Sequence, residues 1–205
     1  MEKFLKNFDK IYCVNLARRS DRWETTKKEF ERFGLLNVNR YEAIDGSTYD
    51  WSNINSNLLV GELGLIETHI NIIKEAIENK YETILIFEDD VMFVDEFYKI
   101  DEYMNALPSD WDMLYLGGNH NYGRYPDYVN DKVIKLNRTY TTHAIAIKSS
   151  LFQNILEITK NRLKQIDVYY ADLHTTHNVY GFSPNLALQR TDFSDIQNRL
   201  VSYNF

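Results

Sequence analysis

Apolar runs and segments of helical periodicity alternate along the first half of the chain. Compact runs rich in β-branched and aromatic residues predict strands at 10–16, 38–44, 83–87 and 113–116. Between them, apolar residues recur at every third or fourth position, which predicts helices at 20–33, 61–79 and 95–107. Ser20 and Asp95 are candidate N-caps, and Gly34 is a candidate helix stop. This alternation is typical of an α/β fold with a mostly parallel central sheet flanked by helices.

Polar segments without either periodicity separate these elements. Two long ones cover residues 45–59 and 117–131, and long loops in compact domains are often functional. The second half of the chain predicts helices at 149–160 and 166–173 and strands at 132–136, 143–148, 178–182 and 186–189. No internal repeat, low-complexity tract or linker divides the sequence, so we expect a single domain over residues 1–205.

Composition narrows the functional classes. Apolar residues make up 44% of the 205 residues, enough for a sizeable core. With 23 Lys and Arg against 30 Asp and Glu, the net charge of -7 disfavours sequence-independent binding of nucleic acid. Cys13, the single cysteine, can form no internal disulfide. No run approaches the roughly eighteen apolar residues of a membrane span, and the N-terminus lacks a signal-peptide pattern, so we expect a soluble cytoplasmic protein without a transmembrane segment.

Three acidic residues, Glu88, Asp89 and Asp90, directly follow the apolar strand at 83–87. In open α/β sheets, ligands bind where the carboxyl ends of the strands meet. Adjacent carboxylates repel one another unless a cation relieves them, and their oxygens suit Mg²⁺ or Mn²⁺, which keeps open positions for phosphate oxygens. The triplet therefore has the outline of a nucleotide-diphosphate site, but taken alone it fits an acidic loop that only caps the next segment at least as well.

Polar residues also follow the first two predicted strands. Arg18, Arg19 and Arg22 come after the first strand, where guanidinium groups can bind phosphate, ribose or base. The same arginines could instead pair with neighbouring acidic side chains. Asp45 and Gly46 follow the second strand. Three successive strands thus end in polar groups, which favours a cleft where these groups converge.

Seven stretches of the sequence resemble glycosyltransferase family 25, the family of bacterial lipooligosaccharide galactosyltransferases and collagen hydroxylysine galactosyltransferases. They are IYCVNLARRSDRWE at 11–24, AIDG at 43–46, GELGLIETHINIIKEAI at 61–77, ILIFEDDV at 84–91, DMLYLGG at 112–118, IDVYY at 166–170, and SPNLALQ with SDI within 183–196. The stretches follow the family order and cover nearly the whole chain. The ordered set, rather than any one stretch, carries the resemblance.

The resemblance implies a GT-A type, Rossmann-like domain with a donor-binding half at about 10–118 and an acceptor-side half at about 119–205. It implies an inverting, metal-dependent transferase that moves galactose or glucose from a UDP-sugar to a hydroxyl of a glycan or a hydroxylated protein. The acidic triplet then corresponds to the family's DxD metal motif. Asp90 is the expected direct ligand of Mn²⁺ or Mg²⁺, with Glu88 beside it at the metal and Asp89 near ribose or sugar.

By the same resemblance, further side chains contact the donor. The expected donor-binding residues are Asn15, Leu16, Arg18, Arg19, Arg22, Asp45, Gly46, His69, Glu88, Asp89, Thr142 and Gln189. His69 belongs to a family Ser-His pair, in which this chain has Thr68, and it could instead be a buried core residue. Thr142 matches the threonine of a family Gly-Thr-Ala stretch, from which His143 departs.

An inverting transferase needs a base that deprotonates the acceptor hydroxyl. Asp167 matches the family's acidic residue before a VYxxxP segment, here at 179–184, and is the expected base. It is expected near the start of a short helix, where it could equally serve as an N-cap. Asp172 and Asp195 are the alternative bases.

Other readings of the sequence remain open. The loop at 117–131 could form part of an acceptor wall or be an ordinary surface loop, and its candidate residues are Asn119, Tyr122, Arg124 and Tyr125. The chain could also be a catalytically inactive nucleotide-sugar-binding protein, or a metal-dependent phosphohydrolase that uses the acidic triplet to activate water. UDP-sugar binding without turnover would favour the first, and sugar release without an acceptor would favour the second.

Overall fold

The computed structural model describes residues 1–120, 127–196 and 199–201. Its helices are α1 (Glu2–Leu5), α2 (Ser20–Arg32), α3 (Val60–Glu78), α4 (Ile100–Ala106), α5 (Phe152–Thr159) and α6 (Ile166–Leu173), with 3₁₀ helices η1 (Asp95–Lys99) and η2 (Ser149–Leu151). Its strands are β1 (Lys10–Asn15), β2 (Asn39–Glu42), β3 (Thr83–Glu88), β4 (Val91–Phe93), β5 (Met113–Tyr115), β6 (Asp127–Tyr128), β7 (Val133–Lys135), β8 (Ala144–Lys148), β9 (Val179–Phe182), β10 (Ala187–Gln189), β11 (Asp192–Ser194) and β12 (Arg199–Val201).

Among the described residues, eight strands form one central sheet in the order β2-β1-β3-β8-β5-β9-β7-β6. β1 pairs in parallel with β2 and β3, and β5 pairs in parallel with β9. β8 runs antiparallel between β3 and β5, and β7 runs antiparallel to β9. Most of these strands therefore point the same way, as predicted. The parallel group β2-β1-β3 brings together the strand ends that the sequence marks as polar.

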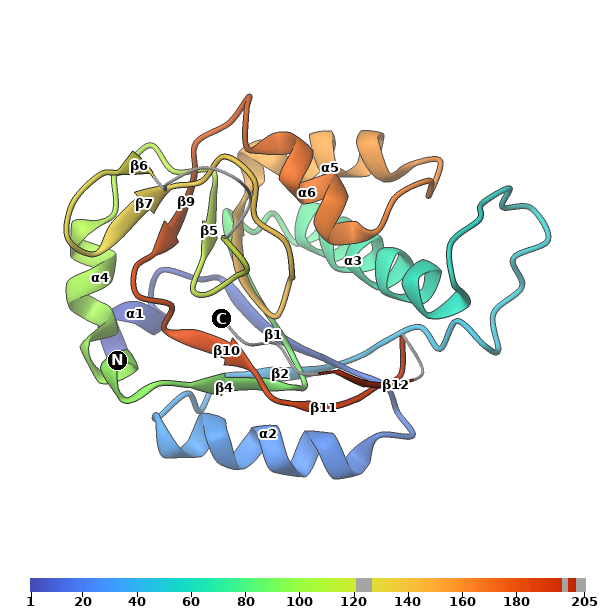
Figure 1. Ribbon diagram of the computed structural model, residues 1–205, viewed down its shortest axis with the longest axis horizontal. Helices are drawn as coiled ribbons and strands as arrows, with labels where there is room; N and C mark the ends of the chain where they lie inside the picture. Colours follow the sequence, from blue (N-terminus) through green and yellow to red (C-terminus); the bar gives the residue numbers. More distant parts are fainter. Residues whose placement is uncertain (121–126, 197–198, 202–205) are drawn as a thin grey trace.

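Helices cover both faces of this sheet, with α3, α5 and α6 on one face and α2 on the other (Figure 1). Two apolar cores separate the layers. Leu85 and Phe87 of β3 belong to the core under α2, whereas Ile84 and Ile86 belong to the core under α3. Because successive side chains of a strand point to opposite faces, β3 is buried on both sides, as its continuous apolar sequence predicts.

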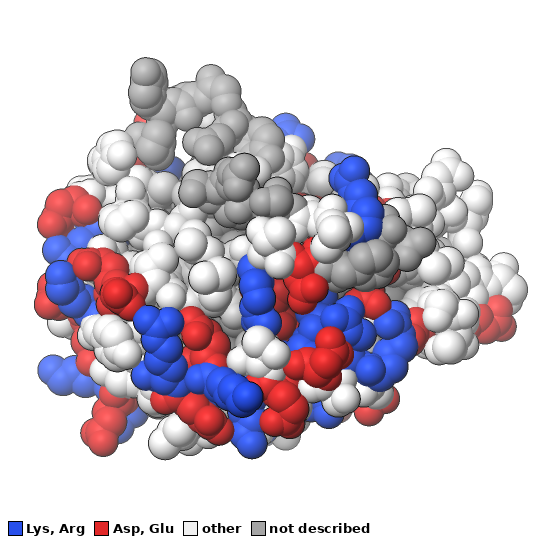
Figure 2. All heavy atoms as spheres, turned by 60° about the horizontal axis from the view of Figure 1, so that its bottom comes forward, with Lys and Arg blue, Asp and Glu red and all other residues white. Residues whose placement is uncertain are grey.

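The outer face of α2, which comes forward in Figure 2, carries interspersed positive and negative side chains. Lys27 and Glu31, for example, are exposed partners one helical turn apart. Of the helices in the described part of the chain, none combines the length and the apolar character needed to cross a bilayer.

The predicted helix from Asp95 is interrupted, because η1 precedes α4. The buried residues Phe97, Ile100 and Tyr103 recur at every third position, which matches the three residues per turn of a 3₁₀ helix. Asp95 is not the predicted cap, since its carboxylate accepts a 2.7 Å hydrogen bond from Arg32 Nη2 instead.

Two other helix ends refine the predicted boundaries. Ser20 is the first residue of α2 rather than its cap, which is Arg19. Gly34 follows α2 with φ of +73°, a conformation that suits glycine at a helix stop. The sequence does not predict the short strands β4, β6, β11 and β12.

Candidate active site

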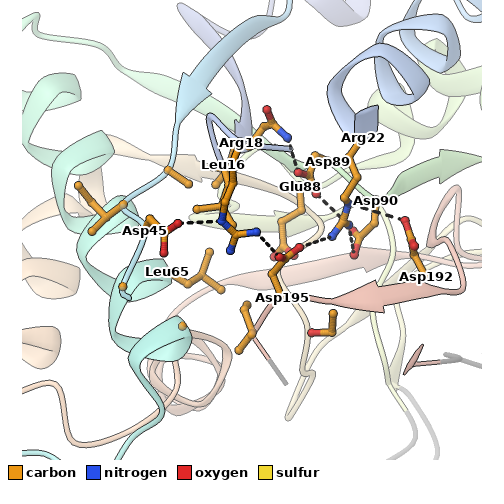
Figure 3. Close-up of a pocket in the computed structure, with 18 of the residues that line it drawn as sticks. Leu16, Arg18, Arg22, Asp45, Leu65, Glu88, Asp89, Asp90, Asp192 and Asp195 are labelled. Carbon is orange, nitrogen blue, oxygen red and sulfur yellow. Dashed lines mark hydrogen bonds and ion pairs between the residues drawn. The ribbon is translucent and has the colours of Figure 1, made fainter. Parts of the chain in front are cut away.

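A pocket of about 190 Å³ lies where β1, β2 and β3 end (Figure 3). We call it the arginine pocket. Many of the predicted site residues line it: Asn15, Leu16, Arg18, Arg22, Asp45, Gly46, Glu88, Asp89, Asp90 and Gln189. The structure therefore brings together the polar groups that follow three different strands.

A second pocket, of about 350 Å³, adjoins the first. We call it the Asp167 pocket, because Asp167 lines it together with Thr141 and Thr142. Both pockets are lined by Leu65, Glu88, Gln189 and Ile196. Two ligands bound side by side would consequently meet at this shared wall.

The acidic triplet forms the bend between β3 and β4. Glu88 ends β3, and Asp89 and Asp90 form the turn before β4. Asn15 Nδ2 donates a 2.5 Å hydrogen bond to Asp89 Oδ2. Arg22 Nη2 lies 2.8 Å from Asp89 Oδ1 and 3.0 Å from Asp90 Oδ2. One buried guanidinium thus compensates two of the three carboxylates.

Burial, with the charge of the neighbouring carboxylates, shifts two pKa values upward. Desolvation, followed by the charge of Asp90, raises the pKa of Glu88 to about 8. Desolvation also raises the pKa of Asp89 to about 6, although Arg22 acts in the opposite direction. Ionised carboxylates at this bend are therefore costly, and an additional cation would relieve that cost.

Two oxygens at the same place lack a donor. Among the described residues, Asp90 Oδ1 and Gln189 Oε1 are buried without a hydrogen-bond partner. Gln189 pairs with Val91, the residue after Asp90, in the β10–β4 ladder. No three His, Cys, Asp or Glu side chains in the described ranges form a ready metal site. The oxygens present fit a hard cation such as Mg²⁺ or Mn²⁺ whose other ligands come from water or phosphate.

Three arginines converge on the carboxylate of Asp195, which follows β11. Figure 3 shows two of them, Arg18 and Arg22, on either side of Asp195. Arg18 donates to Asp195 over 2.6 Å and to Asp45 over 2.8 Å. Arg19, which does not line the pocket, also donates to Asp195, and Arg22 Nη1 lies 3.8 Å from it. Planar guanidinium groups arranged around one anion are suited to bind phosphate.

Asp167 lies in the first turn of α6, after the N-cap Gln165. It is therefore not the helix N-cap, and it makes no capping hydrogen bond to a later turn. Its Oδ1 accepts the N–H of Val168 at 2.8 Å, and its Oδ2 accepts the N–H of Thr141 at 3.3 Å. Desolvation raises its pKa above the ordinary value. A half-buried carboxylate whose pKa is raised by desolvation, and which lines a pocket, has the properties of a general base.

The two alternative bases lie elsewhere. Asp172 is exposed on α6 and pairs with Lys164 over 2.6 Å, and it lines neither pocket. Asp195 lines the arginine pocket, where the arginines bind its carboxylate. Of the three candidates, Asp167 alone lines the second pocket.

The structure does not bring His69 to either pocket. Its side chain is fully buried, and Nδ1 lies 2.9 Å from the hydroxyl of Tyr170. Burial lowers the pKa of His69 to about 3, so the ring is neutral. His69 thus joins α3 to α6, the helix of Asp167, and corresponds to the core alternative.

Other predicted residues lie close to the triplet. Thr142 Oγ1 donates a 2.5 Å hydrogen bond to Glu88 Oε1. At Gly46, a Cβ atom would lie 1.8 Å from the carbonyl oxygen of Val60, so glycine allows the loop to contact the start of α3. Asn119 lines the Asp167 pocket, whereas the other proposed acceptor-wall residues, Tyr122, Arg124 and Tyr125, lie outside the described residues.

Sequence reasoning missed several lining residues. Thr141 precedes the strand β8 and follows no strand end, whereas Arg190 directly follows β10, so the strand-end pattern could have found Arg190. Glu62 lines the Asp167 pocket and also accepts a 2.9 Å hydrogen bond from the N–H of Leu59 at the start of α3. A helix-start pattern marks Glu62 in the sequence, but that pattern says nothing about a pocket.

The fold and the paired pockets define a GT-A-like α/β domain with its ligand sites at the ends of the parallel strands. The chain belongs to glycosyltransferase family 25, because the model of that family, described as "Glycosyltransferase family 25 (LPS biosynthesis protein)", matches residues 8–204. This match confirms the resemblance. The crystal structure of A197 from STIV shares the fold, with a TM-score of 0.52, 12% identity and coverage of 96% of this chain and 94% of that one.

Two curated relatives are named as glycosyltransferases. Procollagen galactosyltransferase 2 of Mus musculus is 25% identical over 197 residues, which cover 84% of this chain and 31% of that protein. Procollagen lysyl hydroxylase and glycosyltransferase of Acanthamoeba polyphaga mimivirus is 28% identical over 223 residues, which cover 94% of this chain and 24% of that protein. The chain thus spans less than a third of the length of these relatives. Family and relatives together support glycosyl transfer as its general activity.

Proposed function

We propose that this chain transfers a hexose, galactose or glucose, from a UDP-sugar to a hydroxyl of a glycan or protein acceptor, with inversion at the anomeric carbon. The observation that carries the proposal is the pair of pockets that share Glu88 and Gln189. One pocket offers guanidinium groups for a diphosphate, and the other offers the half-buried carboxylate of Asp167. A donor and an acceptor held there would have their reacting atoms side by side, which removes much of the entropic barrier.

The donor diphosphate binds Arg18, Arg19 and Arg22 in this proposal. These arginines already surround one anionic group, the carboxylate of Asp195, so their orientation needs little change to bind another. Asp45 and Asn15 lie on the same pocket wall and are available for the ribose or the base. The same guanidinium groups stabilise the charge on UDP as it departs.

Asp90 and Glu88 would hold Mn²⁺ or Mg²⁺, with Oδ1 of Asp90 as the direct ligand. When bound, the ion supplies Lewis-acid stabilisation of the negative charge on the leaving diphosphate. Asn15 and Arg22 bind Asp89 and thereby fix the orientation of the acidic bend.

Asp167 takes the proton of the acceptor hydroxyl. The acceptor oxygen then forms its bond to the anomeric carbon from the face opposite UDP, while the bond from that carbon to the phosphate oxygen breaks. The two backbone N–H groups that bind Asp167 hold its carboxylate in place for this transfer. Its desolvated surroundings raise its pKa, which makes it a stronger base.

Donor turnover tests the proposal. The protein is incubated with UDP-galactose, UDP-glucose and other UDP-sugars, with and without Mn²⁺, and UDP release is measured. We expect metal-dependent release from one UDP-sugar, abolished by Asp90→Ala. Binding of a UDP-sugar without turnover would support an inactive binding protein, and sugar release that no acceptor accelerates would support a hydrolase. Absence of both binding and release would overturn the proposal.

A further inference from the structure

Thr141 has an unusual backbone conformation beside the Asp167 pocket. Its φ is +74°, in the left-handed region. Lys80 and Arg162 also have positive φ, but each follows closely after the end of a helix, where such a residue commonly closes the last turn. Thr141 is β-branched and lies between strands, where this conformation is strained. Strain of this kind persists only where the surroundings enforce it, and it is often found at functional sites.

The segment Thr141–Thr142 touches two carboxyl groups of the Asp167 pocket. The N–H of Thr141 donates to Asp167 Oδ2 at 3.3 Å, and the hydroxyl of Thr142 donates to Glu88 Oε1 at 2.5 Å. The first contact depends directly on the direction in which the strained peptide points its N–H. A relaxed backbone at Thr141 would turn this donor away from Asp167.

The side chain of His143 binds the hydroxyl of Thr141 and fixes its position. The histidine side chain is fully buried, with Nδ1 3.1 Å from Thr141 Oγ1 and Nε2 3.1 Å from the carbonyl oxygen of Ala187. Because a carbonyl only accepts, Nε2 carries the proton and the neutral ring accepts the hydroxyl proton of Thr141 at Nδ1. Burial lowers the pKa of His143, in agreement with a neutral ring.

The carbonyl group of Ala187, to which the His143 ring donates its hydrogen bond, is itself closely packed. The carbonyl oxygen of Ala187 approaches Gly117 so tightly that a Cβ atom there would lie 1.8 Å away. The carbonyl of His143 also accepts the N–H of Glu88 at 3.0 Å. His143 is thus tied to β10 through its ring and to the acidic bend through its backbone.

We propose that His143 is a positioning residue that holds Thr141 in its left-handed conformation, so that residues 141 and 142 orient Asp167 and Glu88 together. The catalytic consequence rests on the proposed function, because it treats Asp167 as the base. The hold of His143 on the Thr141 backbone rests on the geometry alone. This chain therefore uses a histidine outside both pockets to fix the carboxyl groups of one of them.

Three variants test the hold. Thr141→Val keeps the β-branch and loses the hydroxyl, and His143→Ala loses the acceptor. Both should let the backbone relax, lengthening the distance from the nitrogen of residue 141 to Asp167 Oδ2 in crystal structures. The double variant Thr141→Gly/His143→Ala should restore that distance, because glycine adopts positive φ without strain. Tyr12→Phe, which removes a partly buried 2.7 Å hydrogen bond to Glu75 and alters a residue that lines neither pocket, is the control.

Kinetics of UDP release from UDP-galactose with Mn²⁺ test the consequence. For the two single variants we expect kcat to fall about tenfold or more, with the donor KM within about twofold of the original chain. The double variant should recover kcat, whereas a merely structural loss would not be rescued by a second substitution. Tyr12→Phe should lower the melting temperature without changing kcat.

Two outcomes would overturn the inference. One is a His143→Ala structure with the Thr141 conformation and the Asp167 contact unchanged. The other is a double variant no better in distance or kcat than His143→Ala alone. If the original chain releases no UDP from any UDP-sugar, the proposed function fails, and the crystallographic comparison still decides whether His143 holds Thr141.

Discussion

The arginine pocket and the Asp167 pocket differ in how their carboxylates are compensated. In the first, Asp89, Asp90 and Asp195 all lie within 4 Å of Arg22, so the charges compensate one another before any ligand arrives. In the second, no Lys or Arg belongs to the described lining, and backbone N–H groups bind the carboxylate of Asp167. Paired charges can be exchanged for a charged ligand, whereas an uncompensated, desolvated carboxylate favours taking up a proton. The difference supports the proposal that one pocket binds an anion and the other transfers a proton.

Asp167→Asn should distinguish the functions of the two pockets most clearly, because it should change turnover without changing UDP affinity. The amide keeps the shape of the side chain but cannot accept the acceptor's proton, so we expect kcat for UDP release to fall by about 10²–10⁴. UDP affinity, measured by titration calorimetry, should stay unchanged because Asp167 does not line the arginine pocket. Asp172→Asn, on the exposed side of the same helix, is the matched control and should keep full turnover. Equal losses in both variants would refute the assignment of Asp167.

Arg22→Ala should damage the arginine pocket most. Arg22 is only 8% exposed, and its removal leaves Asp89 and Asp90 without their shared partner. Loss of one partner from a buried ion-pair cluster typically costs about 3 kcal/mol, so we expect a fall of that order in the free energy of unfolding. Urea denaturation measures it. Arg32→Ala, which removes an exposed arginine paired with Asp95, should cost far less. A similar cost for the two variants would contradict the compensation described above.

Glu88, which lines both pockets, makes the free energy of unfolding depend on pH. The folded protein keeps the proton on Glu88 up to about pH 8, whereas the unfolded chain releases it near the ordinary value of 4.5. Between these values the folded state binds more protons, so the free energy of unfolding should fall as pH rises through this window. Denaturation in metal-free buffer at several pH values measures the slope, and Glu88→Gln should make it smaller. A slope that is unchanged in Glu88→Gln would assign the proton to another group.

The arginine pocket could largely be predicted from the sequence, because its residues follow strands that show clear apolar runs. Parallel strands bring their ends to one edge, so Asp45 and Glu88 become neighbours although they are far apart in the chain. The Asp167 pocket is harder, since it depends on which side of each helix faces outward. Asp172 is about 140° away from Asp167 around the helix axis, so the two cannot face the same pocket, but the sequence does not tell which of them faces it.

His69 and Thr141 show what the sequence leaves open. His69 lies beside Ile66 and Ile70 on α3, and its neighbours do not reveal whether that face meets a pocket or the core. Contact with Tyr170, about a hundred positions later, decides the matter. The conformation of Thr141 likewise depends on Asp167 and on His143, which in turn binds Ala187. Such arrangements arise from tertiary packing, which local sequence patterns do not predict.

Asp195→Asn should produce the smallest effect of these variants. The direction in which it changes UDP affinity is nevertheless the most informative result. The Asp195 carboxylate lies where three guanidinium groups converge, so the free protein holds an anion of its own in the place proposed for the diphosphate. Neutralising it removes a competitor, and we expect UDP to bind about two- to fivefold more tightly. Asp21→Asn, which removes an exposed partner of Arg19 outside the pocket, is the control and should leave UDP affinity unchanged. Weaker UDP binding by Asp195→Asn would mean that Asp195 orients the arginines for the ligand rather than competing with it.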